Sequence, residues 1–159
     1  MPDIFVSYAS EDRARINKLV TILEAEGWQV WWDRDLVVGP EYDDAIEKAL
    51  AESSCVIVAW SQHAIKSRWV RDEANEGLER DVLLPVIIDD VQPPLGFRSA
   101  QTANLTGWPD RTGELDRLLS GIRRLVESTR PTNNAMAYEL YRQGLNEYPS
   151  ITSGIPLRP

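Results

Sequence analysis

The segment SRWVRDE contains the residues best suited to chemistry, which are Ser67, Trp69 and Glu73. Trp69 and Glu73 are four positions apart, so on a helix they lie one turn apart on the same side. An indole ring and a carboxylate placed in this way can face one shared concavity, where the carboxylate could act as an acid or a base. Glutamates at the boundary of a helix face are also common for structural reasons. The residues alone therefore leave both interpretations of Glu73 open.

The periodicity of the same segment indicates where Glu73 points. Val70, Ala74, Gly77 and Leu78 recur at helical spacing, and we expect them to form the buried stripe of a helix. At about 100° per residue, Glu73 lies roughly 85° from the centre of that stripe. We therefore expect Glu73 to flank the buried face.

Short apolar runs alternate with amphipathic segments along the chain, and this alternation predicts the fold. The runs occupy residues 3–8, 28–33, 54–60, 82–88 and 102–107. Strands that are covered on both faces and joined by helices build a parallel sheet through right-handed crossovers. The sequence thus predicts an α/β domain with a flavodoxin-like, doubly wound, five-stranded parallel sheet. Pro85 cannot donate a ladder hydrogen bond, so we expect the fourth strand to be interrupted, bulged or near an edge.

Open parallel sheets bind ligands beyond the carboxyl ends of their strands, where the strand order reverses. Three loops of this chain meet that condition, namely residues 8–12, 33–40 and 61–67. The third of them leads into the helix that carries Trp69 and Glu73. The candidate residues therefore lie at the end of the sheet where a ligand is expected.

Composition and charge argue against several partners. The chain has 17 basic and 25 acidic residues, and its formal net charge of −8 would repel a phosphate backbone. The apolar runs are too short to span a bilayer, and no basic leader precedes an apolar segment. Cys55 is the single cysteine, so no intrachain disulfide and no metal-ligand spacing is expected. We predict a soluble, cytoplasmic protein that binds neither nucleic acid, membrane nor metal.

Common catalytic fingerprints are missing from the sequence. There is no GxxxxGK[ST] motif and no GxGxxG motif after the first strand. His63 is the only histidine, and no nucleophile stands near it in a suitable turn. A phosphorylated receiver domain would need an acidic residue at the end of the third strand, where this chain has Trp60 and Ser61.

Three motifs in order, DIFVSYASEDR, WWDRDLVVG and S-x-W-x-x-x-E, resemble the Toll/interleukin-1 receptor (TIR) domain family in its bacterial form. The resemblance covers about residues 1–128, which we predict to be the TIR domain. Residues 129–159 are expected to be a tail with a short amphipathic helix, either a linker or the start of a repeat or docking segment.

Many members of this family hydrolyse NAD+, whereas others only assemble signalling complexes. The resemblance implies that Glu73 is the catalytic residue and that Trp69 packs beside it. Cleavage between ribose and nicotinamide releases a neutral base from a cationic pyridinium, so no general acid is needed and one carboxylate suffices. Glu73 would hold the ribose hydroxyls and stabilise the oxocarbenium-like charge. NAD+ is then the substrate, and no cofactor is expected.

The resemblance also implies roles for the three loops. Residues 33–40 are expected to cover the site and to mediate self-association or association with other TIR domains. Trp31 and Trp32 alternate sides, so one of them is expected in the core. The predicted substrate-binding residues are Trp69, Tyr8, Ser10, Trp32, Asp33, Arg34, Lys66 and Arg68, among which Tyr8 could stack on a ring and the three cations could meet a diphosphate.

Three functions follow as hypotheses. The leading one is an NAD+ glycohydrolase that releases nicotinamide, gives ADP-ribose or a cyclic ADP-ribose isomer, and is activated by self-assembly in antiphage defence. The second is a non-enzymatic module that binds other TIR domains through residues 33–40. The third is an effector that interferes with the TIR signalling of a host.

Overall fold

The described part of the chain contains a sheet of five parallel strands. The computed structural model describes residues 2–32, 42–98, 102–108 and 112–128, and the chain divides into two units, Met1–Val126 and Glu127–Pro159. The strand order is β2-β1-β3-β4-β5, and every neighbouring pair is parallel. The strands are β1 (Ile4–Ser7), β2 (Val30–Trp31), β3 (Cys55–Trp60), β4 (Leu83–Ile87) and β5 (Ala103–Asn104). The predicted doubly wound, five-stranded parallel sheet is confirmed, while the predicted tail lies outside the described residues.

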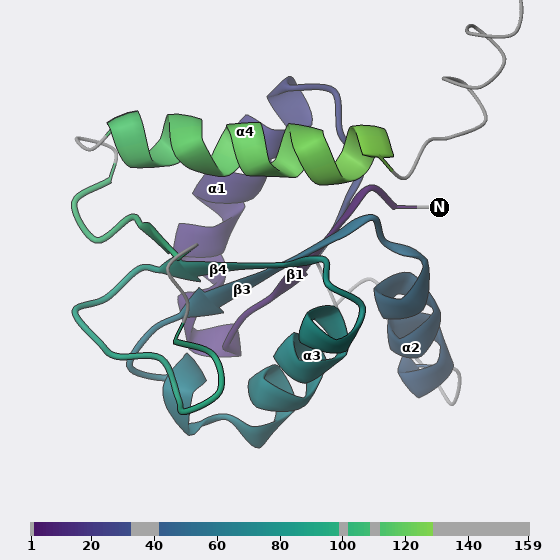
Figure 1. Ribbon diagram of the computed structural model, residues 1–159. Coiled ribbons are helices and arrows are strands. Elements are labelled where there is room, and N and C mark those ends of the chain that lie inside the picture. Colours follow the sequence, from purple (N-terminus) through teal and green to yellow (C-terminus); the bar gives the residue numbers. More distant parts are fainter. Residues whose placement is uncertain (1, 33–41, 99–101, 109–111, 129–159) are drawn as a thin grey trace, which may run out of the picture. The chain divides into compact units, whose positions relative to one another are not determined.

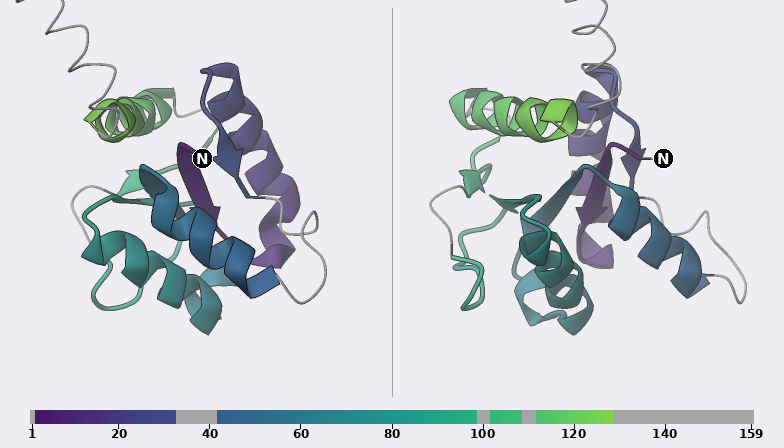
Figure 2. Two further views of the ribbon diagram at one scale, coloured as in Figure 1. Left: turned by 90° about the vertical axis from the view of Figure 1, so that its right-hand side faces the viewer. Right: turned by 45° about the vertical axis from the view of Figure 1, so that its right-hand side comes forward.

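Helices cover both faces of this sheet, which is why its strands read as continuous apolar runs. The helices are α1 (Arg13–Ala25), α2 (Tyr42–Glu52), α3 (Arg68–Glu79) and α4 (Thr112–Ser128), with short 3-10 turns η1 (Ser10–Asp12) and η3 (Ala64–Lys66). Figure 1 shows α1 and α4 on one side of the strands and α2 and α3 on the other, and the two views of Figure 2 agree. Among the described helices, none is long and apolar enough to cross a membrane.

Strand β1 divides its side chains between the two faces by simple alternation. Ile4, Val6 and Tyr8 belong to the core cluster that includes residues of α1 and α4. Phe5 packs in the cluster that includes residues of α2, and Ser7 contacts a residue of α3. The period of two along a strand therefore sends Ser7 to the face that α2 and α3 cover.

Pro85 lies inside β4 without costing the sheet a hydrogen bond. The N–H of Ile88 donates to the carbonyl of Trp60 on β3 at 3.0 Å, and backbone groups alternate sides along a strand. The nitrogen of Pro85, three residues earlier, therefore faces β5. Strand β5 pairs only with Val86 and Ile87, so Pro85 has no partner to lose on that side. The prediction that this strand lies near an edge is confirmed, since the edge strand β5 is its neighbour.

The buried stripe of α3 differs from the predicted one at a single position. Val70, Ala74 and Gly77 are buried as expected, but Leu78 is 46% exposed, so its predicted place in the stripe is wrong. Helix α3 contacts the sheet through the small residues Ala74 and Gly77, and Leu78 lies outside this contact. Without Leu78 the centre of the stripe moves about 20° toward Glu73 at about 100° per residue.

Gly77 allows α3 to approach the sheet closely. A Cβ atom added at Gly77 would lie 2.9 Å from Cβ of Val56 on β3 and 3.3 Å from Cδ1 of Leu83 on β4. The first distance is shorter than packed carbon atoms tolerate, and the Cβ of Val56 belongs to a buried central strand. Any side chain at this position would push the helix away from the sheet.

We therefore expect Gly77→Ala to lower the free energy of unfolding by about 1–3 kcal/mol, the usual cost of overpacking. Chemical denaturation followed by circular dichroism measures this change. Gly121→Ala is the matched control, because a Cβ atom at Gly121 in α4 would lie 3.5 Å from Leu84, an ordinary contact. Equal free energies of unfolding for both variants would contradict the close approach at Gly77.

Candidate active site

Helix α3 begins at Ser67, which caps it. The backbone of Ser67 is extended, with φ −91° and ψ 116°, and its Oγ accepts a hydrogen bond from the N–H of Val70 at 3.2 Å. This is the usual N-cap geometry, in which a serine oxygen satisfies a backbone donor of the first turn. The cap fixes where the helix starts, and so places Trp69 in its first turn and Glu73 in its second.

Glu73 lies inside the fold rather than at its boundary. Its side chain is 4% exposed, and its Oε1 accepts a hydrogen bond from the Oγ of Ser7 at 2.7 Å. Ser7 is fully buried on β1, which lies between β2 and β3. The carboxylate therefore points from α3 to the sheet. Glu73 was expected beside the buried face of α3, and it is itself one of the buried residues of that helix, together with Val70, Ala74 and Gly77.

Trp69 is exposed to a much larger degree than Glu73. Its side chain is 43% exposed, one turn before the carboxylate on the same helix. The predicted spacing on α3 is thus confirmed, with the ring at the surface and the carboxylate in the interior. A shared concavity for the two groups stays a prediction.

Tyr8 binds the backbone of Trp32, the residue that directly follows β2. Its ring is 6% exposed, and its hydroxyl donates to the carbonyl of Trp32 at 2.9 Å. The guanidinium of Arg13 lies 5.1 Å from the ring centre of Trp32, which packs on the α1 side of the sheet. Trp31 stacks on Phe5 on the opposite side, with ring centres 5.1 Å apart. Tyr8 and Trp32 thus anchor the residue that precedes the loop 33–40, and their contact with a ligand stays a prediction.

The remaining predicted substrate-binding residues divide into two groups. Ser10 begins η1, while Lys66 ends η3 and Arg68 begins α3, and all three are exposed on segments that follow β1 and β3. Asp33 and Arg34 lie outside the described residues, as does the rest of the loop 33–40. The first group therefore stands at the expected end of the sheet, and its contact with a ligand stays a prediction.

A polar network joins the segments that follow β1, β3 and β4. Asp12 is 2% exposed, accepts a hydrogen bond from the hydroxyl of Ser61 and pairs with Arg15 at 2.6 Å. Arg15 reaches on to Asp89, whose Oδ1 lies 2.7 Å from its Nη1. The N–H of Gln62 donates to the other oxygen of Asp89 at 2.9 Å. The carboxyl end of the sheet is therefore tied together by charged hydrogen bonds.

These contacts change the acidity of two groups in the network. The hydrogen bond from Arg15 is the main reason why the pKa of Asp89 lies below its ordinary value; burial opposes it, and the hydrogen bond from the N–H of Gln62 adds to the lowering. The hydrogen bond with Asp89 likewise raises the pKa of Arg15. Elsewhere, burial raises the pKa of the Cys55 thiol, so this cysteine is not an activated nucleophile.

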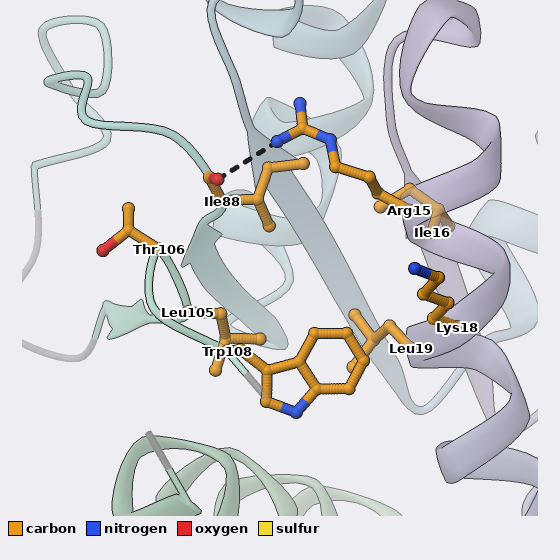
Figure 3. A pocket seen from close by; sticks show the side chains of 8 residues that line it. All are labelled: Arg15, Ile16, Lys18, Leu19, Ile88, Leu105, Thr106 and Trp108. Carbon is orange, nitrogen blue, oxygen red and sulfur yellow. Dashed lines mark hydrogen bonds between the residues drawn. The ribbon is translucent and has the colours of Figure 1, made fainter. Parts of the chain in front are cut away.

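A cavity of about 210 Å³ opens on the other face of the sheet from Glu73. Figure 3 shows side chains of α1 on one side of it and residues that follow β4 and β5 on the other. Its lining consists of Arg15, Ile16, Lys18, Leu19, Ile88, Leu105, Thr106 and Trp108. Because α1 and α3 lie on opposite faces, this cavity is not the site of the carboxylate. Among the described residues, no group of three or more potential metal ligands gathers.

Residues 4–119 match the protein family described as TIR domain. The chain belongs to the TIR domain family. This match covers the sheet, the cap at Ser67 and the buried carboxylate of Glu73. The family resemblance of the three sequence motifs is thereby confirmed.

One relative of this TIR domain is similar to it over part of the sequence. It is 31% identical over 93 residues to the probable 2′ cyclic ADP-D-ribose synthase TcpO of Methanobrevibacter olleyae. That match covers 55% of this chain and 27% of the relative, so the chain corresponds to about a quarter of that protein.

Two solved structures share the fold at 23% sequence identity each. The TIR domain of the Toll-related receptor TRR-2 from Hydra magnipapillata has a TM-score of 0.68, covering 77% of this chain and 99% of that one. The TIR domains of the activated Roq1 resistosome, which directly recognises the pathogen effector XopQ, have a TM-score of 0.50, covering 92% of this chain and 99% of that one.

Sequence reasoning missed Ser7 as a member of this site. A signal was present, because Ser7 is the one hydroxyl residue in the otherwise apolar strand IFVS. Alternation along the strand sends it to the α3 face, where a buried hydroxyl needs a partner. The interpretation of DIFVSY as a core strand passed over this position.

The network at Asp89 makes a prediction about acid stability. Because the folded-state pKa of Asp89 lies below its unfolded value, its ionised form stabilises the fold fully above the unfolded pKa. This contribution is lost as the pH falls through the folded-state pKa. We expect the unfolding free energy of the wild type to exceed that of Asp89→Asn at pH 6, and the difference to shrink below about pH 4.

Urea denaturation at several pH values measures this difference. Asp90→Asn is the control, because Asp90 is the exposed neighbour of Asp89 in the chain. A difference between the wild type and Asp89→Asn that grows on acidification would show that the sign is reversed.

Proposed function

We propose that this TIR domain cleaves NAD+ between ribose and nicotinamide, with Glu73 as the catalytic carboxylate. The observation that carries the proposal is the burial of Glu73, which is 4% exposed at the junction of α3 and β1. A buried carboxylate costs free energy that an apolar residue at the same position would not. Such costs are expected where a side chain has a chemical task.

The relative from Methanobrevibacter olleyae supports the same chemistry. Its name describes a synthase of 2′ cyclic ADP-D-ribose. We infer from this name that the reaction of the present chain leads to ADP-ribose or to a cyclic ADP-ribose. Membership of the TIR domain family is compatible with that substrate class.

The proposed step needs one carboxylate. The bond between C1 of the ribose and the pyridinium nitrogen breaks, and its electron pair neutralises the nitrogen, so no proton donor is required. Positive charge develops on the ribose, and the carboxylate of Glu73 stabilises it in surroundings that exclude water. Attack by water, with loss of a proton, gives ADP-ribose. Attack by another nucleophilic group of the same molecule, with loss of a proton, gives a cyclic ADP-ribose.

We further propose that self-assembly activates this reaction through the loop 33–40, in the setting of antiphage defence. A carboxylate that is 4% exposed must become accessible before a substrate can reach it. The dilute chain is therefore expected to be slow. Crowding on a surface should raise the rate per molecule.

The test measures nicotinamide release from NAD+ by the purified chain on affinity beads of increasing density. We expect Glu73→Gln, which keeps the volume and removes the charge, to lower the rate by at least about 100-fold. Glu76→Gln is the matched control, because Glu76 is exposed on the same helix and its substitution should leave the rate unchanged. Mass spectrometry distinguishes ADP-ribose from a cyclic product, which is lighter by one water.

Two outcomes would contradict different parts of the proposal. Equal rates for the wild type and Glu73→Gln would remove Glu73 from the chemistry. No release by the wild type at any density would overturn the enzymatic function and favour a module that only binds other TIR domains.

A further inference from the structure

We propose that Ser7 is a positioning residue, which holds the Glu73 carboxylate in its working orientation by the hydrogen bond from Oγ to Oε1. This inference rests on the proposed function, since it assigns Ser7 a part in the same reaction. It concerns a residue of the sheet 66 positions away from Glu73 in sequence.

The first observation is that Ser7 stands on a rigid part of the fold. It ends β1, which pairs with β2 at Ile4 and Phe5 and with β3 along its whole length, where the register partner of Ser7 is Val58. Ser7 and Val58 are both fully buried. A hydroxyl on such a strand has little freedom to move, so it can define a direction for the group that it binds.

The second observation is that only a polar partner explains a hydroxyl at this place. Ser7 lies on the same face of β1 as the apolar Phe5, and the buried Ala9 follows just after the strand. A buried hydroxyl without a partner would be unfavourable there. The hydroxyl of Ser7 donates a hydrogen bond to Oε1 of Glu73, and the two oxygens are 2.7 Å apart, a distance typical of an O–H group that donates to a carboxylate.

The third observation is that the helix is held at the distance that this bond needs. Gly77 is one turn after Glu73 and brings α3 against Val56 of the neighbouring strand β3. Both ends of the hydrogen bond are therefore fixed by backbone packing. A carboxylate held in this way presents its oxygens to a substrate without first having to reorient.

Ser7 could instead serve only to dock α3 on the sheet, and kinetics distinguish the two roles. A group that positions the carboxylate for the transition state changes kcat and leaves KM nearly constant. A group that only docks the helix changes stability, with no change in kcat of the folded protein. The comparison therefore needs a second buried serine whose loss affects stability alone.

Ser53 is that control. It is fully buried directly after α2, and its hydroxyl donates to the carbonyl of Ala49 in that helix at 2.5 Å. Ser53→Ala removes the same atom as Ser7→Ala from another buried site. Circular dichroism at the assay temperature gives the folded fraction of each variant, by which the rates are corrected.

The experiment measures nicotinamide release by the full chain at high bead density. We expect Ser7→Ala to lower kcat by about 10- to 100-fold with KM within about threefold, and Ser53→Ala to leave both unchanged. Ser7→Cys keeps most of the volume but donates weakly, so it should be nearly as slow as Ser7→Ala. Ser7→Thr keeps the hydroxyl and should recover most of the rate.

Other results would contradict either the positioning role of Ser7 or the proposed function. A Ser7→Ala kcat equal to that of the wild type, or a Ser7→Cys kcat equal to it, would overturn the positioning role while the proposed function stands. An inactive wild type would overturn the proposed function, and the positioning role with it. If Ser7→Thr does not fold, the comparison of Ser7→Ala, Ser7→Cys and Ser53→Ala still decides.

Discussion

The hydrogen bond between Ser7 and Glu73 joins the interior of the sheet to helix α3, and the site depends on that junction. A charged group survives burial only where a donor meets it, and the donor must stand on backbone that does not move. The close packing at Gly77 fixes the distance between α3 and the sheet, because it leaves no room between them. These contacts fix both the position of the Glu73 carboxyl group and its orientation. The serine cap of α3 sets the register of the helix from which it projects.

The loops that follow the strands are held by a separate set of interactions. Asp12, Arg15 and Asp89 link three segments at the carboxyl end of the sheet, and Tyr8 fastens Trp32 just before the loop 33–40. These contacts are charged or use a buried hydroxyl, so they constrain geometry more sharply than apolar packing would. Among the described residues, these contacts join the segments at the end of the sheet where parallel folds bind ligands. Glu73 and this network contribute to one end of the fold from different elements.

The two faces of the sheet bury different sets of residues in this TIR domain. The face under α1 and α4 holds the larger core cluster, and it also holds the cavity beside Trp108. The face under α2 and α3 holds two smaller clusters and the buried pair of Ser7 and Glu73. The catalysis that we propose would take place on the second face, where a helix packed through Gly77 encloses the carboxyl group of Glu73. The two solved structures at 23% identity share only the fold with this chain, so its function has to be sought in such local arrangements.

The sequence by itself determined the fold class, the five strands, the family and the helix that carries Glu73, because these depend on periodicity and on short motifs that local residues encode. Tertiary structure alone decided that Glu73 is enclosed, that Leu78 is exposed and that Ser7 is the partner of the carboxylate. Periodicity states which side of an element is apolar, but it does not state how deeply a helix sits on a sheet. That depth comes from contacts between residues far apart in the chain, such as Gly77 with Val56, and only the folded chain brings them together.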